Sequence, residues 1–307
     1  MNDSDPISPA RPRCVALMNQ KGGVGKTTTT VNLAAAIAQA GFRTLVIDLD
    51  PQAHATLGLG LDSAEGRSIY DLMHDPAGAV SAARDIATNL SALASHTDLA
   101  ATETELASAE DRLERLKAVI GAFSGKVDFV LIDCPPSLGL LTLNALNAAD
   151  EVLIPMQAHF LALQGVGKLL ETVKLLASGP QALNPNLRVA GVVLCMHDAG
   201  STHTREVVAD LDAFFESGRT NDVPWKDAKV FRPAIRRNIK LAESPSFGKT
   251  IFDYAPQASG AEDYRALADA YLADRRLAAE TREDPPLVVT RAASIGEPVA
   301  DSTGASA

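Results

Sequence analysis

The chain has 307 residues, of which 46% are hydrophobic, and its formal net charge is −10. This length suffices for one large α/β domain or two small ones, and the acidic balance argues against a chain coated all over with nucleic acid. The longest apolar runs are too short to span a membrane, and no signal peptide opens the chain, so we expect a cytoplasmic protein.

Strands and helices alternate along the chain. Apolar, β-branched runs predict buried parallel strands, and the predicted strands cover residues 14–18, 44–48, 129–133, 152–155 and 189–196. The clearest predicted helices cover 27–40, 163–177 and 204–215. Residues 63–126 are expected to form an alanine-rich, largely helical insertion. The alternation predicts a mostly parallel twisted sheet with helices on both faces and with ligands at the carboxyl ends of its strands.

The two ends differ in composition from the rest. Residues 1–12 and 281–307 are rich in proline and small or polar residues, which predicts disorder, and residues 13–280 are predicted to form one domain. Three cysteines, Cys14, Cys134 and Cys195, stand in separate predicted strands or at a strand end, without C-x-x-C spacing. They are interpreted as reduced, buried thiols and not as a metal site.

A glycine-rich loop joins the first predicted strand to the first predicted helix. It reads Asn19-Gln20-Lys21-Gly22-Gly23-Val24-Gly25-Lys26-Thr27-Thr28 and has two lysines, whereas the common phosphate loop G-x-x-x-x-G-K-[ST] has one. Glycines allow the backbone N–H groups to close around phosphate oxygens at a helix N-terminus. Residues 22–28 are predicted to cradle the phosphates, with Lys26 at the β- and γ-phosphates and the Thr27 hydroxyl on Mg²⁺.

Three aspartates stand at or just beyond the ends of predicted strands. Asp48 and Asp50 are two residues apart, so both carboxylates can face the phosphate loop. One of them can hold the Mg²⁺ shell while the other orients a water for attack on the γ-phosphate. Asp133 ends the strand 129–133, where a Walker-B carboxylate belongs. A strand-end aspartate can also cap the next helix, which is the structural alternative for each of them taken singly.

These motifs together resemble the ParA/Soj family of partition ATPases, within the group of deviant-Walker P-loop proteins that includes MinD. The matching segments are Lys21–Thr28, Val46–Gln52, Val130–Ser137 and Arg237–Lys249, and the resemblance spans about residues 13–275. It implies a slow, partner-stimulated ATPase that uses ATP and Mg²⁺. By the same resemblance, Asp50 is the water-positioning residue, and Asp48 is predicted to join Thr27 and Asp133 at the metal.

The resemblance also assigns a role to Lys21. In such proteins two ATP-bound subunits face each other, and the first lysine of the loop reaches the partner's nucleotide. A second cation near the phosphates neutralises charge that Lys26 and Mg²⁺ leave uncompensated, so nucleotide state and homodimer formation become coupled. The structural alternative for Lys21 is a solvated loop lysine.

A basic stretch stands near the C-terminal end. Residues 219–249 contain eight Lys or Arg and three Asp or Glu, a local balance of +5 (8 − 3). The resemblance implies that the ATP-bound homodimer binds DNA non-specifically through this part of the chain, by salt-sensitive phosphate contacts. A DNA-bound ParB-type adaptor is the implied stimulating partner. A solvated charged face is the alternative. The predicted DNA-binding residues are Arg205, Arg232, Arg236, Arg237, Lys240 and Lys249.

Other functions of related proteins fit the sequence less well. A MinD-like membrane-cycling ATPase needs a C-terminal amphipathic helix, but the tail after Pro285 has one arginine and no aromatic residue. An iron–sulfur protein needs paired cysteines, and a tyrosine kinase of related fold needs tyrosines in the tail, beyond Tyr271. The phosphate loop alone is compatible with a metabolic ATP-dependent ligase, which the 237–249 motif disfavours. We therefore predict a nucleoid-associated ATPase that partitions a chromosome, a plasmid or another cargo and makes no contact with membrane.

Overall fold

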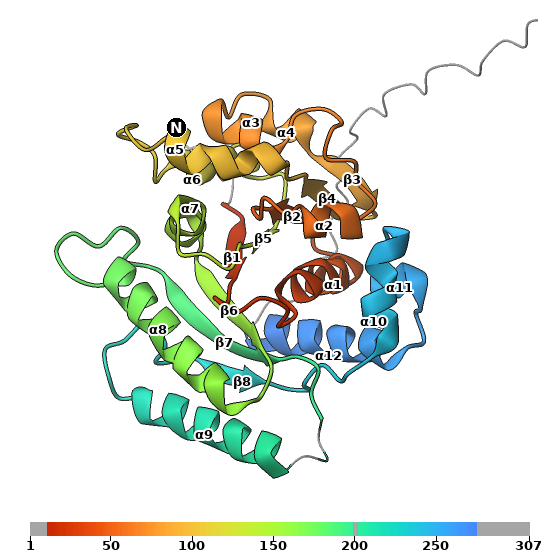
Figure 1. Cartoon of the computed structure of the whole chain (residues 1–307), viewed down its shortest axis with the longest axis vertical. Coiled ribbons are helices and arrows are strands. Elements are labelled where there is room, and N and C mark those ends of the chain that lie inside the picture. The colour runs from red at the N-terminus through yellow and green to blue at the C-terminus, as the bar shows by residue number, and fades with distance from the viewer. Residues whose placement is uncertain (1–10, 199, 201, 275–307) are drawn as a thin grey trace, which may run out of the picture.

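The computed structural model describes residues 11–198, 200 and 202–274, without the side chains of residues 160–164 and 203. Over these residues the chain folds around one eight-stranded sheet with helices on both faces (Figure 1). The predicted fold class, a mostly parallel sheet covered on both sides, is confirmed. The predicted disordered ends lie outside the described residues, apart from residues 11 and 12.

The sheet is parallel except at one edge. Its strand order is β3-β4-β2-β5-β1-β6-β7-β8, and only β3 runs antiparallel to its neighbour. Because β1, β2 and β5 are adjacent and parallel, their carboxyl ends meet at one edge of the sheet. The strands are β1 (Arg13–Leu17), β2 (Thr44–Asp48), β3 (Arg84–Ala87), β4 (Leu90–Leu93), β5 (Phe129–Asp133), β6 (Glu151–Met156), β7 (Arg188–Leu194) and β8 (Lys229–Phe231).

Two groups of helices cover the sheet. One face carries α1 (Lys26–Gln39), α11 (Ile251–Tyr254) and α12 (Ser259–Asp274). The other carries α3 (Ile69–His74), α6 (Arg115–Gly121), α7 (Leu140–Ala148), α8 (Phe160–Ala177) and α9 (Thr202–Gly218). Short helices complete the chain: α2 (His54–Gly58), α4 (Ala79–Ala82), η1 (Thr97–Ala101), α5 (Thr102–Glu105), α10 (Ile239–Glu243) and η2 (Ser244–Phe247).

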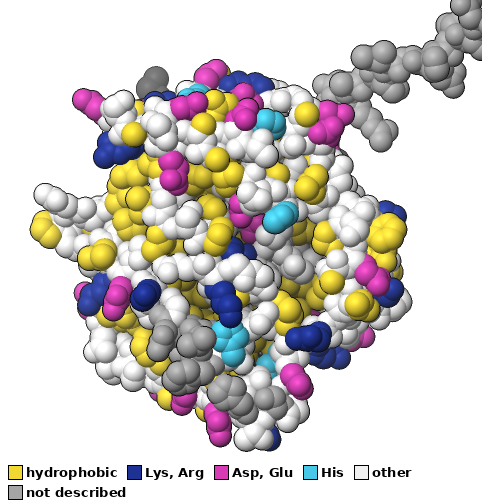
Figure 2. All heavy atoms as spheres, viewed as in Figure 1, with side chains coloured by type: hydrophobic (Ala, Val, Ile, Leu, Met, Phe, Trp, Pro, Cys, Tyr) yellow, Lys and Arg dark blue, Asp and Glu magenta, His cyan; other side chains and the backbone are white. Residues whose placement is uncertain are grey.

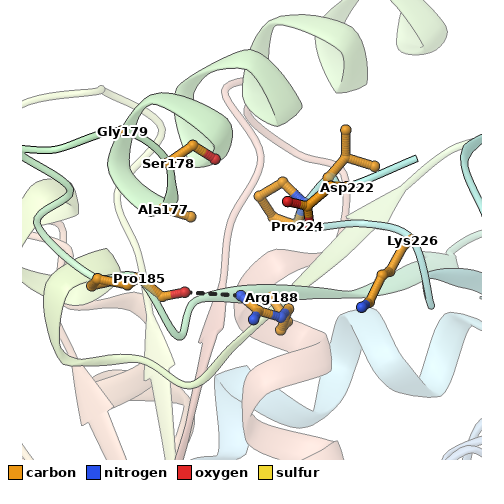
Figure 3. A pocket seen from close by; sticks show the side chains of 9 residues that line it. Ala177, Ser178, Gly179, Pro185, Arg188, Asp222, Pro224 and Lys226 are labelled. Carbon is orange, nitrogen blue, oxygen red and sulfur yellow. Dashed lines mark hydrogen bonds between the residues drawn. The ribbon is translucent and has the colours of Figure 1, made fainter.

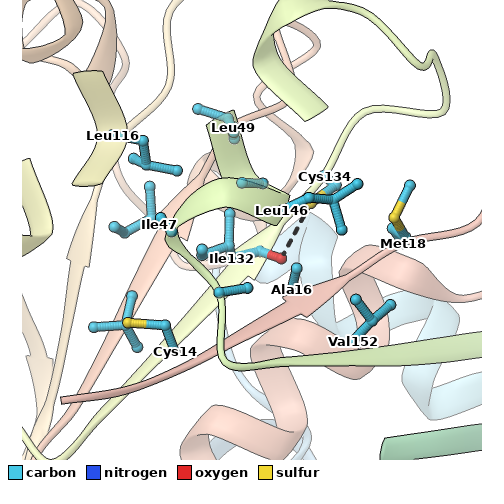
Figure 4. Packing of buried hydrophobic residues seen from close by; sticks show 14 of the residues in the cluster. Cys14, Ala16, Met18, Ile47, Leu49, Leu116, Ile132, Cys134, Leu146 and Val152 are labelled. Carbon is cyan, nitrogen blue, oxygen red and sulfur yellow. Dashed lines mark hydrogen bonds between the residues drawn. The ribbon is translucent and has the colours of Figure 1, made fainter. Parts of the chain in front are cut away.

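Each central strand contributes side chains to two separate cores. In β1, Cys14 and Ala16 pack into one core, whereas Val15 and Leu17 pack into the other, as the alternation of a strand requires. Figure 4 shows the first of these cores, where residues of β1, β2, β5 and β6 meet α6 and α7. Burial on both faces explains why these strands are continuous apolar runs in the sequence.

The insertion predicted over residues 63–126 differs from the expectation. It is not largely helical, because it contributes β3 and β4, which extend the sheet beyond β2. The strand β4 has the sequence LSAL and β3 the sequence RDIA, both short and poor in β-branched residues, so their pattern is weak. The three-residue strand β8 was likewise not predicted. The five predicted strands and the three predicted helices are all present.

The cysteines form no bridge. Cys14, Cys134 and Cys195 are free and buried, which confirms the prediction of buried thiols. Burial raises the pKa of Cys195 to about 11 and that of Cys14 to about 12, so neither thiol is poised to react. Among the helices in the described ranges, none is both long and apolar enough to cross a membrane.

Candidate active site

The loop between β1 and α1 presents its backbone to solvent. Gly25, directly before α1, has a φ of +96°, and Gly23 has a φ of +72°, values that glycine adopts without strain. A methyl group added at Gly22 or Gly23 would meet no atom within 4 Å. An anion can therefore come close to the backbone N–H groups at the start of α1, where the helix dipole favours negative charge.

Close packing beneath the loop also requires a glycine at position 25. A methyl group at this position would lie 3.1 Å from both Cβ and Sγ of Cys195, which follows β7. The same thiol lies 3.4 Å from the hydroxyl of Thr29, which in turn is 3.1 Å from the hydroxyl of Tyr264 on α12. The floor of the loop is thus a close-packed contact between three elements that are distant in sequence.

The two lysines of the loop occupy different environments. Lys26 is 8% exposed, and its Nζ donates to the carbonyl of Lys21 at 3.3 Å. The backbone N–H of Lys21 donates to the side chain of Asn19 at 3.0 Å, so the main chain of Lys21 is held from both sides. The side chain of Lys21 is exposed, and its Nζ contacts His159 at the start of α8.

The carboxylate of Asp133 joins β5 to the first turn of α1. Thr27 Oγ1 donates to Asp133 Oδ2 at 2.7 Å, and Thr30 Oγ1 donates to Asp133 Oδ1 at 2.8 Å. Asp133 is fully buried, and this burial raises its pKa well above the usual range, with a further rise from the neighbouring carboxylate of Asp48. A cation at this edge of the sheet would relieve that unfavourable burial of negative charge.

Asp48 and Asp50 have different surroundings although they are two residues apart. Asp48 is buried, and its Oδ2 accepts from both the N–H and the hydroxyl of Thr56, each at 2.7 Å. Burial raises its pKa. Asp50 is only half-buried, and its carboxylate accepts from the N–H of Gln52 at 3.0 Å. Asp48 therefore fixes the exit of β2 to α2, whereas Asp50 has carboxylate lone pairs left for a water.

The donors at this edge fit Mg²⁺ with a nucleotide. They are a hydroxyl, Thr27, and two carboxylates, Asp133 and Asp48, all of them hard oxygen donors. Within the described residues there is no cluster of three or more His, Cys, Asp or Glu that could hold a metal by itself. Mg²⁺ usually takes one or two carboxylates and completes its shell with water and phosphate oxygens, so the small protein donor set is consistent with a metal held jointly with ATP.

Comparisons with known proteins agree with this geometry. Residues 12–189 match the family model described as "AAA domain". Sporulation initiation inhibitor protein Soj of Bacillus subtilis is 41% identical over 83% of this chain and 96% of its own. Chromosome-partitioning ATPase Soj of Thermus thermophilus is 43% identical over 86% of this chain and 97% of its own. The chain belongs to the Soj/ParA family of chromosome-partitioning ATPases.

The resemblance predicted from the motifs is thereby confirmed. A solved structure of cobyrinic acid a,c-diamide synthase from Mycobacterium smegmatis, with bound ATP analogue and magnesium, is 33% identical. It covers 90% of this Soj/ParA chain and all of its own, with a TM-score of 0.71. A Cyanothece McdA(D38A)–ATP complex, 20% identical with a TM-score of 0.73, covers 89% of this chain and 100% of its own and shares the fold.

The predicted DNA-binding residues separate into two groups in this Soj/ParA chain. Three have acidic partners: Arg232 contacts Asp212 at 2.7 Å, Arg236 contacts Asp263 at 2.8 Å and Glu262 at 3.0 Å, and Lys240 contacts Glu243 at 2.8 Å. The carboxylate of Asp263 is only 5% exposed, and it also accepts from the backbone N–H of Arg236 at 2.8 Å. The contacts of Arg232 and Arg236 tie the basic stretch to α9 and α12, whereas the contact of Lys240 lies within α10.

All six predicted residues are exposed, but within the described part of the chain the other three take part in no ion pair. Arg237 and Lys249 point to solvent, and Arg205 donates to the hydroxyl of Thr202 within the first turn of α9 at 3.2 Å. On the face seen in Figure 2, Lys and Arg side chains are interleaved with Asp and Glu. Ion pairs therefore compensate part of the positive charge of the basic stretch.

Several site residues were not predicted from the sequence. Thr30 lies one turn after Thr27 on α1, and this i, i+3 spacing was the available signal. Thr56 binds Asp48 from α2, and Gln157 and His159 reach the phosphate loop from the connection between β6 and α8. Their position after the carboxyl end of a parallel strand was the only sequence signal for this contact.

One surface hollow lies away from the phosphate loop. Its volume is about 320 Å³, and Figure 3 shows Arg188 and Lys226 at its rim. Arg188 begins β7, so the hollow lies at the amino end of the strand, opposite the edge that holds Asp133. It is therefore separate from the candidate active site.

Proposed function

We propose that ATP binding brings two copies of this chain together, that the dimer binds DNA without sequence preference, and that hydrolysis releases it. The predicted activity as an ATPase, with ATP and Mg²⁺ as cofactors, is in agreement with the family and with the donor set at the edge of the sheet. The dimer, the DNA, a ParB-type adaptor and a location on the nucleoid are the proposed extensions of that partitioning role.

In the proposed hydrolysis, the residues of the candidate active site have different roles. Lys26 neutralises the β- and γ-phosphates, and Thr27 and Asp133 hold the metal, with Asp48 adjoining them. Mg²⁺, when bound, offsets negative charge that develops on the phosphate oxygens. Asp50 orients the attacking water, because its half-buried carboxylate keeps free lone pairs.

The observation that carries the dimer proposal is the difference in exposure between the two loop lysines. Lys26 is buried beneath the loop, whereas Lys21 is exposed and its Nζ lies 2.7 Å from His159 Nε2. Lys26 serves the triphosphate bound to its own subunit. Lys21 lies at the surface, where its ammonium can pair with the phosphates of a nucleotide bound to a second subunit. A lysine supplied in this way makes dimer formation depend on ATP.

The exposed cations support the DNA proposal. Arg237, Lys249 and Arg205 lie at the surface of a chain that is acidic as a whole, so DNA contact would be confined to a small basic area. Doubling that area in a dimer multiplies the phosphate contacts and strengthens salt-sensitive binding. An adaptor of ParB type, with a basic segment, is the proposed stimulator of hydrolysis.

The test combines DNA binding with size measurement. The chain is incubated with ADP, ATP or a slowly hydrolysed ATP analogue, each with Mg²⁺, and its mass and its retention on DNA of two unrelated sequences are measured. We expect a dimer and DNA binding with the analogue, and a monomer without DNA binding with ADP. The variant Lys21→Ala should bind ATP and stay monomeric. DNA binding by an ADP-bound monomer would contradict the proposal.

A second measurement separates partitioning from the synthase chemistry of the Mycobacterium smegmatis neighbour. The chain's ATP hydrolysis is followed with DNA plus a ParB-type protein, and separately with ammonia or glutamine plus a carboxylic acid substrate. We expect stimulation only in the first mixture. The higher identity to the Soj proteins, 41–43%, than to the synthase structure, 33%, supports this choice.

A further inference from the structure

The end of β6 and the connection from β6 to α8 contact the phosphate loop at three places. The contacts are Asn19 Nδ2 to the Pro155 carbonyl at 2.9 Å, Gln157 Nε2 to the Gly23 carbonyl at 3.3 Å, and Lys21 Nζ with His159 Nε2 at 2.7 Å. The first two hold only the main chain or the base of the loop. The third holds the side chain of Lys21, the exposed lysine to which the proposed function gives the decisive role.

The chemistry of the Lys21–His159 contact shows which group donates the hydrogen bond and which accepts it. A lysine ammonium has three donors and no acceptor, so His159 Nε2 must accept and its ring must be neutral, with the proton on Nδ1. The main chain of Lys21 is held as well, by Asn19 at its N–H and by Lys26 at its carbonyl. Lys21 is therefore fixed at both ends to its own subunit.

We propose that His159 is a positioning residue that holds Lys21 on its own subunit, and that ATP-dependent dimer formation must break this contact. The inference rests on the proposed role of Lys21 in reaching a partner's nucleotide. A lysine cannot keep its Nζ at 2.7 Å from His159 and also cross to a second subunit. His159 therefore opposes dimer formation until the phosphates of a bound nucleotide offer a stronger acceptor.

Lys26 links nucleotide occupancy to this release. Its Nζ donates to the carbonyl of Lys21 at 3.3 Å, and the same ammonium is the group expected to turn toward the phosphates. Phosphate oxygens bind an ammonium more strongly than a neutral carbonyl does. When Lys26 turns toward them, the main chain of Lys21 loses one of its two anchors, and the remaining contact with His159 becomes easier to break.

The expected size of the effect follows from the exposure of the contact. Hydrogen bonds to an exposed neutral acceptor lie at the lower end of the usual free-energy range, about 0.5 kcal/mol, which corresponds to a preference of about 2.3-fold for each contact. A dimer breaks two such contacts, so the factors multiply. Removing the acceptor should strengthen ATP-dependent dimer formation by about fivefold.

The first experiment measures the dimer dissociation constant in ATP analogue and Mg²⁺ by analytical ultracentrifugation. His159→Ala should lower it by about fivefold, and His159→Gln, whose amide oxygen can accept from Lys21, should restore a value near wild type. His74→Ala is the matched control, since the His74 ring packs against Tyr70 on α3, and it should change nothing. Dimer formation that is unchanged or weaker in His159→Ala, with normal ATP binding, would overturn the inference.

The second experiment does not depend on dimer formation. Long-range ¹⁵N NMR of the histidine rings in the nucleotide-free protein should show one neutral ring with an unprotonated, hydrogen-bonded Nε2, assigned through His159→Gln. Lys21→Ala should shift that Nε2 signal toward an unbonded value. If wild type forms no dimer but the NMR signature is present, the proposed function fails while the contact stands. If the wild-type dimer forms but the signature is missing, the inference about His159 fails alone.

Discussion

The edge of the sheet at the phosphate loop and the basic stretch 219–249 differ in how closely distance along the sequence matches distance in the structure. At the edge, Thr27, Asp48 and Asp133 are separated by many residues, yet they meet at the ends of adjacent strands and the start of α1. In the basic stretch, Arg236 and Arg237 are neighbours in sequence, yet one is bound to a buried carboxylate and the other points to solvent.

The difference has a physical origin. Parallel pairing of β1, β2 and β5 brings their carboxyl ends together whatever the side chains are, so backbone topology alone assembles the edge. A charged side chain on a short irregular segment takes its partner from whichever helix packs nearby. For Arg236 that helix is α12, which supplies Asp263 and Glu262. The function of a residue at the edge can thus be assigned from its position at the end of a strand. In the basic stretch, the partners of each side chain must be known before a function can be assigned.

Asp50→Ala should have the largest effect and tests whether position at the edge decides function. ATP hydrolysis should fall by about 100-fold or more, the usual range for a residue that positions or activates the attacking group. ATP binding should persist, because the carboxylate of Asp50 is half-buried and holds only the N–H of Gln52. Turnover is measured by phosphate release, and the dimer by sizing in ATP and Mg²⁺.

The variant Asp50→Asn is the matched control for this experiment. Its amide oxygen can still accept from Gln52, but the negative charge is lost, so hydrolysis should fall as in Asp50→Ala while folding is retained. Both variants should accumulate as ATP-bound dimers. Hydrolysis near the wild-type rate in either variant would transfer the role to another group, with Asp48 the nearest candidate in the chain.

Gly25→Ala tests the floor of the loop. A left-handed φ of +96° costs a non-glycine residue about 1–2 kcal/mol, and the new methyl would press on Cys195 at 3.1 Å. We expect a loss of stability of that order and a weaker affinity for ATP, measured by denaturant unfolding and by nucleotide titration. The loss caused by Gly25→Ala should be smaller in a Cys195→Gly background, measured against the Cys195→Gly variant alone. If the loss is the same in both backgrounds, the backbone angle alone is responsible.

Features set by backbone position could be predicted from the sequence, whereas contacts set by the packing of helices could not. The two-lysine loop and the strand-end aspartates were predictable because glycine spacing and apolar strands report backbone position directly. The strands β3 and β4 were missed because four-residue segments such as LSAL have almost no pattern. The contacts of Arg236 with Asp263 and of Lys21 with His159 were not predictable, because both join segments whose relative placement depends on the packing of whole helices.

Arg237→Glu should have a smaller effect and tests a residue of the basic stretch that takes part in no ion pair within the described residues. DNA affinity of the ATP-bound protein should fall by about tenfold, and the salt dependence should decrease by about one contact for each subunit. Lys226→Glu makes the same charge change at the hollow on the opposite edge of the sheet. It should leave DNA affinity close to wild type. Equal losses in both variants would indicate an effect of net charge and not of a site.

Arg236→Ala should have the smallest effect on DNA binding and a visible effect on stability. Hydrogen bonds that the Arg236 guanidinium donates to Asp263, and then to Glu262, raise the pKa of Arg236. Its positive charge is therefore already paired with two carboxylates before any DNA binds. Removing it leaves the Asp263 carboxylate, 5% exposed, with its backbone donor alone. The melting temperature should therefore fall, while the affinity for DNA changes less than in Arg237→Ala.

Arg236→Lys separates charge from geometry at the same position. A lysine keeps the positive charge but cannot donate to Asp263 and Glu262 through a planar fork. We expect it to restore only part of the melting temperature. A strong loss of DNA affinity in Arg236→Ala, with an unchanged melting temperature, would mean that DNA phosphates displace the carboxylates of α12 from the guanidinium. The paired residues of the basic stretch would then belong to the DNA surface with Arg237, and backbone position would suffice to assign function there too.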